Sequence, residues 1–182
     1  MLAIASAPLG GGIGRRGWVV NAQVSPDYLR TDIEAHLEQL AVSLGCAGPG
    51  VGFLTAASVD RLTTATDDGV TVFATVGLQH PTWAAPTDAN EDAAVGTINV
   101  IAFVPARLTD AAMVNAVMTA TEAKAQALGD CGVRGTGTAS DAVCILMPDE
   151  GPAESFGGPR SRVGAPLARA AHRAVRDGVT RS

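Results

Sequence analysis

The sequence lacks several features that would place it in a familiar class of protein. Aromatic residues make up only 4%, and the three cysteines are widely spaced. An odd number of cysteines at such spacings predicts neither a disulfide framework nor a zinc site. Three scattered histidines also lack metal-ligand spacing, so we expect no bound metal. No run approaches the roughly 18 apolar residues that a transmembrane helix needs.

Positive charge is also too scarce for a nucleic-acid-binding protein. The 182 residues carry 13 Lys and Arg against 18 Asp and Glu, a formal net charge of -5, whereas phosphates demand clustered basic residues. The basic stretch over residues 160–176 is interleaved with apolar residues at helical spacing, and we interpret it as a solvated helix face. The N-terminus lacks the basic flank and the length of a signal peptide, so we expect a cytoplasmic protein.

The sequence does contain enough apolar residues for a sizeable core, with 47% hydrophobic against 17% charged. Its length fits one domain over residues 1–182, with a glycine-rich segment at 1–16. Patterning predicts strands at 18–24, 51–57, 70–76, 97–104 and 142–147, and helices at 31–44, 110–128 and 163–177. This order predicts an α/β or α+β layered domain, in which about three helices cover a mixed sheet of about five or more strands.

Two local signals refine this outline. Thr31 is the expected N-cap of the first helix, with Glu34 completing a capping box, and Gly45 ends that helix. Residues 12–17 match the letters of the dinucleotide-binding pattern GxGxxG, but that fingerprint requires a helix N-terminus after it. Because Trp18-Val19-Val20 predicts a strand there, we reject a dinucleotide site. The glycines instead permit close approach of the backbone to a ligand or a neighbouring strand.

The helix predicted over residues 110–128 carries a polar stripe. Asn115, Thr119 and Glu122 fall on one side, opposite an apolar face. The stripe fits either solvated surface or fixed hydrogen bonds to a ligand. Lys124 falls within the apolar face, so it must either extend past the helix end to solvent or pair with a buried carboxylate.

A second set of polar residues lies near the starts of two predicted strands. Residues 135–141 (GTGTASD) form either a turn closed by Asp141 or a nest of backbone amides that binds an anion. Thr97 and Asn99 begin the strand at 97–104. Asn21 lies within an apolar strand, where a buried amide must brace a loop or touch a ligand.

The long connection over residues 78–95 fits a lid or a surface excursion equally well. His80 lies in this connection and could reach an active site. His36 and His172 are predicted on helices, at the surface.

Five segments occur in an order that extends over nearly the whole chain: Asn21 to Val24, Val51 to Ala57, Gly96 to Asn99, Val114 to Lys124, and Gly135 to Asp141. Together they resemble the adenosylcobinamide amidohydrolase family. The resemblance implies hydrolysis of the aminopropanol amide of adenosylcobinamide to adenosylcobyric acid, in corrinoid salvage. The cobalt belongs to this small-molecule substrate, so no further cofactor is implied.

Amide hydrolysis needs an activated nucleophile, a stabilised oxyanion and an acid for the departing amine. We assign the general base to Asp141 or Glu122, and charge stabilisation or carboxylate orientation to Lys124. Thr138 or Ser140 is an alternative covalent nucleophile. The oxyanion would bind the amides of residues 135–138 together with Asn99 or Asn115. The full substrate-binding set is Asn21, Thr97, Asn99, Asn115, Thr119, Gly135, Thr136, Gly137 and Ser140.

Two other functions use the same residues. A non-catalytic corrinoid-binding protein would hold the amide side chains of the ring without cleaving any of them. An acyltransferase-like enzyme with a threonine nucleophile would depend on the glycine–threonine turn alone. Neither nucleic acid nor a membrane is expected as a partner, and the sequence leaves a homo-oligomer open. The hydrolase hypothesis requires the glycine–threonine turn and the polar helix stripe to face one cleft.

Overall fold

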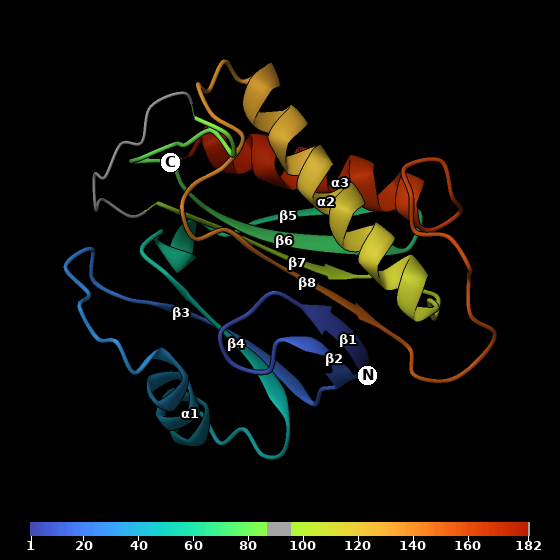
Figure 1. The fold of residues 1–182 in the computed structure, drawn as a ribbon, viewed down its shortest axis with the longest axis horizontal. Coiled ribbons are helices and arrows are strands. Elements are labelled where there is room, and N and C mark those ends of the chain that lie inside the picture. The colour runs from blue at the N-terminus through green and yellow to red at the C-terminus, as the bar shows by residue number, and fades with distance from the viewer. Residues whose placement is uncertain (87–95, 182) are drawn as a thin grey trace.

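The computed structural model describes residues 1–86 and 96–181, and its centre is a six-stranded mixed sheet (Figure 1). The strand order is β2-β1-β8-β7-β6-β5. These strands are β1 (Leu2–Ala5), β2 (Gly12–Arg15), β5 (Thr63–Asp67), β6 (Val70–Gly77), β7 (Thr97–Phe103) and β8 (Ala142–Met147). β7 and β8 pair in parallel, whereas the other neighbours pair antiparallel. The crossover that a parallel pair needs is provided by α2 (Asp110–Asp130).

A smaller unit packs against the face of this sheet that the long helices leave uncovered. In it, β3 (Trp18–Gln23) pairs in parallel with β4 (Gly50–Thr55), and α1 (Ile33–Ser43) connects them. The short 3-10 helix η1 (Val59–Arg61) follows β4. We call β3, α1 and β4 the small unit, and the six-stranded sheet with α2 and α3 (Gly164–Val179) the main unit. Figure 1 shows α2 and α3 on one side of the sheet and the small unit on the other.

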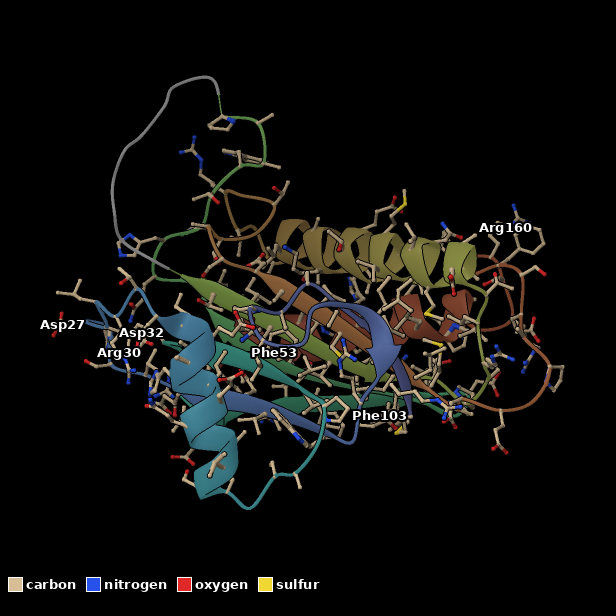
Figure 2. All side chains as sticks on the ribbon, turned by 60° about the horizontal axis from the view of Figure 1, so that its bottom comes forward. Asp27, Arg30, Asp32, Phe53, Phe103 and Arg160 are labelled. Carbon is tan, nitrogen blue, oxygen red and sulfur yellow. The ribbon has the colours of Figure 1, made fainter. Side chains whose placement is uncertain are left out.

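Alternation along the strands creates two separate cores. On β7, Ile98 and Val100 point toward α2 and α3, where they join a large apolar cluster. Ile101, one residue on, faces the opposite side, where it packs on a smaller cluster that contains Phe53 of β4. Phe53 lies near the middle of the molecule in Figure 2. The sheet is therefore buried on both faces, as its nearly continuous apolar strands predict.

The predicted fold class is confirmed, because the structure is an α+β arrangement around a mixed sheet. The strand predicted over residues 142–147 is β8, with the same bounds. Three further strands, β1, β2 and β5, were not predicted. Of the three predicted helices, α2 and α3 pack on the main sheet, while α1 packs on β4.

The capping box predicted for the first helix is wrong. Asp32 is the N-cap of α1, and its side chain makes no cap hydrogen bond. The carboxylate of Asp32 instead accepts from the Arg30 guanidinium at both oxygens, at 2.9 and 2.7 Å. The predicted helix end is correct, since α1 stops at Ser43 and Gly45 follows with a φ of 74°.

The glycine-rich segment forms the β1–β2 hairpin, and β3 rather than a helix follows it. The close approach expected of its glycines is made to a neighbouring strand, because a Cβ on Gly10 would collide with the carbonyl oxygen of Gly50 in β4. Within the part of the chain that the structure describes, no helix combines the length and the apolar character needed to span a membrane.

Candidate active site

A pocket of about 290 Å³ lies between the main sheet and the small unit. Its inner wall includes Thr97 and Asn99 of β7 and Ser140 just before β8, and its outer wall includes Tyr28 and Arg30 from the segment between β3 and α1. A neighbouring pocket of about 460 Å³ shares Thr97 and continues toward Leu78 and Gln79. We call the two pockets together the groove. It lies at the carboxyl ends of the parallel strands β3 and β4, where such units commonly bind ligands.

Two asparagines connect the units at the base of the groove. Asn99 Nδ2 donates to Asn21 Oδ1 and to the carbonyl oxygen of Leu54, each at 2.9 Å. Asn21 Nδ2 in turn donates to Thr75 Oγ1 at 3.1 Å. Asn99 is 1% exposed, and its Oδ1 has no hydrogen-bond partner among the described residues. A buried acceptor without a partner costs about 1–3 kcal/mol, so this oxygen is suited to an N–H group of a ligand.

Two hydroxyl groups lie beside these amides on the inner wall. The Oγ atoms of Thr97 and Ser140 are 2.8 Å apart, and Ser140 Oγ also donates to the carbonyl oxygen of Gly96 at 2.9 Å. Both residues line the pocket of about 290 Å³. The starts of β7 and β8 therefore present hydroxyls and an amide to the same cavity.

Lys124 pairs with a carboxylate inside the protein rather than extending to solvent. Its Nζ donates to Asp141 Oδ2, and the two side chains are 7% and 14% exposed. Asp141 also accepts from the Thr138 amide at 3.1 Å, from the Thr138 hydroxyl at 2.5 Å and from the Ile98 amide at 2.9 Å. A carboxylate has about four acceptor positions. Those of Asp141 are all engaged within the protein, which leaves none to activate water.

The glycine–threonine turn is closed by Asp141 and does not form an anion nest. The Gly135 amide donates to the Val133 carbonyl, the amides of residues 136 and 137 donate to the Thr82 carbonyl, and the Thr138 amide donates to Asp141. The prediction of an oxyanion site at the amides of residues 135–138 is therefore wrong. Of the two interpretations that the sequence left open, the structure has the closed turn.

Glycine is needed at two positions of this turn because its neighbours leave no space. A Cβ on Gly137 would collide with Asp141 and Lys124, and one on Gly135 would lie 2.8 Å from the carbonyl oxygen of Thr82. Thr136 is half-buried, and its Oγ1 accepts a hydrogen bond from the Ala84 amide at 2.9 Å. These three residues pack the turn against residues 82–84, and none of them lines the two pockets of the groove.

The polar stripe of α2 faces another part of the molecule. Thr119 Oγ1 donates to the carbonyl oxygen of Gly157 at 2.9 Å, and Asn115 lies against Gly158. Glu122 is exposed. The condition that this stripe and the glycine–threonine turn face one cleft is not met, because the loop before α3 covers Asn115 and Thr119. The turn meets α2 through Lys124 instead.

The histidines and the long connection can also be placed. His80 is exposed, and His172 contacts Asp130 at 2.8 Å. Of the connection over residues 78–95, the part from 87 to 95 lies outside the described residues, so its interpretation as a lid stays a prediction.

Cys144 is fully buried, and burial raises its thiol pKa to about 12, which suits a core residue. Across residues 1–86 and 96–181, no three His, Cys, Asp or Glu side chains are grouped to hold a metal.

Sequence reasoning missed the outer wall of the groove. Tyr28 is half-buried, and its hydroxyl lies 2.7 Å from Nδ1 of His36 on α1. The two rings stack, with centroids 5.4 Å apart and planes at 18°. Arg30 and Asp32 lie beside the start of α1 in Figure 2. One feature of the sequence could have pointed to this wall. Tyr28 is the single tyrosine of the chain, and it lies in an aperiodic segment eight residues before a histidine.

Comparison with known proteins gives one family. The whole chain, residues 1–182, matches the family model described as adenosylcobinamide amidohydrolase. An adenosylcobinamide amidohydrolase from Methanosarcina mazei is 33% identical over 150 residues, which cover 81% of this chain and 72% of that protein. No solved structure matches the chain.

Two further relatives match over shorter stretches. An adenosylcobinamide amidohydrolase from Halobacterium salinarum is 36% identical over 115 residues, or 59% of this chain and 48% of that protein. An uncharacterized protein from Methanocaldococcus jannaschii is 33% identical over 89 residues, or 44% of this chain and 34% of its own length. The chain thus matches about half of the first of these relatives and about a third of the second.

Proposed function

Because the chain belongs to the adenosylcobinamide amidohydrolase family, we propose that it cleaves the aminopropanol amide of adenosylcobinamide and yields adenosylcobyric acid in corrinoid salvage. In this reaction, water adds its oxygen to the amide carbonyl carbon, the C–N bond breaks, and aminopropanol leaves. Membership of an amidohydrolase family makes the chain an enzyme, so the alternative of a non-catalytic corrinoid carrier is not favoured. The requirement that the turn and the α2 stripe share a cleft was therefore wrong, and the proposal rests on the groove instead.

The unpartnered Oδ1 of Asn99 is the observation that supports this proposal most directly. Corrinoids carry several carboxamide arms. The N–H group of such an arm can donate the hydrogen bond that the buried Oδ1 of Asn99 lacks. Asn21 and Leu54 fix the other end of the Asn99 amide group, so its oxygen is held in one orientation. Asn99 therefore binds the arm that carries the scissile amide.

The size of the groove suits one arm of the substrate rather than the whole ring. Pockets for drug-sized ligands have volumes of about 300–1,000 Å³, and a corrinoid is larger than such ligands. The pocket beside Asn99 measures about 290 Å³, and its neighbour about 460 Å³. The aminopropanol arm enters the smaller pocket, and the macrocycle lies across the opening of the larger one.

The predicted catalytic and substrate-binding residues divide into two groups in this arrangement. Ser140 and Thr97 line the smaller pocket, so their hydroxyls orient the attacking water, or Ser140 itself attacks. Lys124, Asp141 and Thr138 lie behind this wall and hold β7 and the turn in place through the Ile98 amide. A base role for Glu122 stays a prediction, as does a covalent role for Thr138.

Purified protein incubated with adenosylcobinamide tests the proposal by the amount of aminopropanol released. We expect steady turnover, and a decrease of about 10- to 100-fold in kcat/KM for Asn99→Ala, which follows from the loss of one buried hydrogen bond. Gln39→Ala, a change of an exposed amide on α1, is the matched control and should keep the wild-type rate. Tight binding without release of aminopropanol would favour the carrier instead.

A further inference from the structure

From the outer wall of the groove, we infer that Tyr28, held by His36, is the catalytic residue that gives a proton to the departing amine. This inference rests on the proposed amide hydrolysis and adds a step to it. An amine leaves a tetrahedral intermediate only if its nitrogen is protonated as the C–N bond breaks. The site must therefore contain an acid that reaches the nitrogen.

The composition of the smaller pocket restricts this acid to the outer wall. Among the described residues that line it, only Tyr28 and Arg30 have side chains that titrate; the others are apolar, hydroxyl or amide residues. Arg30 donates to both carboxylate oxygens of Asp32, and this hydrogen bonding raises the pKa of the guanidinium further. Arg30 therefore keeps its proton, and Tyr28 is the side chain able to release one.

His36 fixes the position of the Tyr28 ring, and its Nδ1 is within hydrogen-bonding distance of the Tyr28 hydroxyl. The phenol oxygen and His36 Nδ1 are 2.7 Å apart, which is hydrogen-bonding distance for either direction of donation. The His36 backbone amide donates to the Asp32 carbonyl at 3.0 Å, as part of the first turn of α1. A ring fixed on a helix, stacked on the tyrosine and bonded to its hydroxyl, gives the phenol a defined position at the pocket wall.

The proton transfers balance over one turnover. Tyr28 donates its phenolic proton to the amide nitrogen while the C–N bond breaks, and the electron pair of that bond stays on nitrogen. The phenolate is then reprotonated through Nδ1 of His36, 2.7 Å away, and His36 regains its proton from solvent. Water adds its oxygen to the carbonyl carbon and releases one proton to solvent, which balances the proton that His36 regains. The carboxylic acid so formed then loses its proton, and the free amine of aminopropanol takes up one to become an ammonium ion, so these two steps also balance.

A change of leaving group separates this role from a role in binding. With adenosylcobinamide, we expect Tyr28→Phe to lower kcat by about 100-fold or more and to leave KM nearly unchanged. With the 4-nitroanilide of adenosylcobyric acid, the same variant should lose less than about fivefold, because nitroaniline is weakly basic and leaves without a full proton transfer. Nitroaniline release is followed by its colour, and aminopropanol release as before.

Two further variants complete the experiment. Leu29→Ala alters an adjacent side chain that is 90% exposed and lies outside the pocket lining, so both rates should stay at the wild-type level. His36→Gln keeps a hydrogen-bonding group but no group that titrates. We expect a decrease of about 10-fold in kcat on adenosylcobinamide, which the nitroanilide again largely removes. If Tyr28→Phe does not fold, His36→Gln decides the question by the same comparison of substrates.

Equal losses on both substrates, or a kcat of Tyr28→Phe within about twofold of wild type, would refute the assignment while amide hydrolysis itself stands. A wild-type protein that releases no aminopropanol would refute the proposed function, and this assignment with it. The two failures are distinguished by the wild-type rate alone.

Discussion

The main unit and the small unit differ in how many residues of their helices are buried. α2 buries nine of its residues and α3 eight, whereas α1 buries only Leu37 and Ala41. Leu29 is 90% exposed, and Val42 of α1 is 75% exposed. Since buried apolar area is the main source of stability, the main unit supplies most of it. The small unit contributes a wall of the groove.

Polar groups gather where the two units meet. Asn21 of the small unit bonds to Asn99 of the main unit, and Tyr28, which is bonded to His36, lines the same pocket as Thr97 and Ser140. A site between a well-packed unit and a loosely packed one can keep one wall fixed while the other adapts to a large ligand. Three changes test this division, beginning with the one of largest effect.

Replacing Lys124 by Met should destabilise the whole protein most. The change leaves the charge of Asp141 without its partner in the interior, which costs about 3–5 kcal/mol. The free energy of unfolding in urea measures this loss. The double variant Lys124→Met with Asp141→Asn should recover part of it, because no uncompensated charge remains. A loss below about 1 kcal/mol would mean that the pair behaves as a surface salt bridge.

Truncating one buried leucine in each unit compares the two directly. Leu167→Ala in α3 should lower the free energy of unfolding by about 2–5 kcal/mol and speed amide exchange throughout the main unit. Leu37→Ala should cost about 2 kcal/mol, because α1 lies at the surface and can settle into the space. The faster amide exchange caused by Leu37→Ala should stay within α1. If Leu37→Ala speeds exchange in α3 equally, the two units unfold together and the comparison fails.

The ion pairs that hold α3 to β5 should have the smallest effect, and this effect should disappear in acid. Hydrogen bonds from Arg169 and Arg173 lower the pKa of Asp67 to about 2. A carboxylate with a lowered pKa stabilises the fold above its unfolded-state value of about 3.9. This contribution is lost as the pH falls from there toward 2. Asp67→Asn should therefore slightly lower Tm at pH 6 and flatten its decrease between pH 4 and 2.

Asp60→Asn, in the exposed turn η1, is the control for this acid effect and should keep the wild-type profile. High salt should weaken the difference between Asp67→Asn and wild type, because the two arginines are exposed. An Asp67→Asn profile identical to wild type would show that α3 is held by its apolar face alone.

The sequence predicted the elements that bury a regular apolar pattern. β8 was predicted with its bounds because all six of its residues are apolar and buried. β1 has only four residues, too few to show a period at the start of a chain. Tyr28 was missed because its segment is aperiodic, and only the fold brings it to the pocket that Thr97 also lines.

The errors within the site arise from contacts with distant segments. The amides of residues 136 and 137 are occupied by Thr82, more than fifty residues earlier. The stripe of α2 is covered by Gly157 and Gly158 from the loop before α3. A single helix or turn does not show what will cover it. The partner of Lys124 could not be chosen for the same reason, although a buried carboxylate was one of the two alternatives.

Backbone hydrogen bonds connect Thr82, close to the larger pocket, with the glycine–threonine turn. Residues 78 and 79 line that pocket, Thr82 follows three residues later, and its carbonyl oxygen is bonded to the amides of residues 136 and 137. The segment that lines the larger pocket is thus bonded to the turn whose Gly137 lies against Lys124 and Asp141. A change in the backbone at Thr82 would therefore disturb the wall of the larger pocket and the turn beside the buried ion pair together.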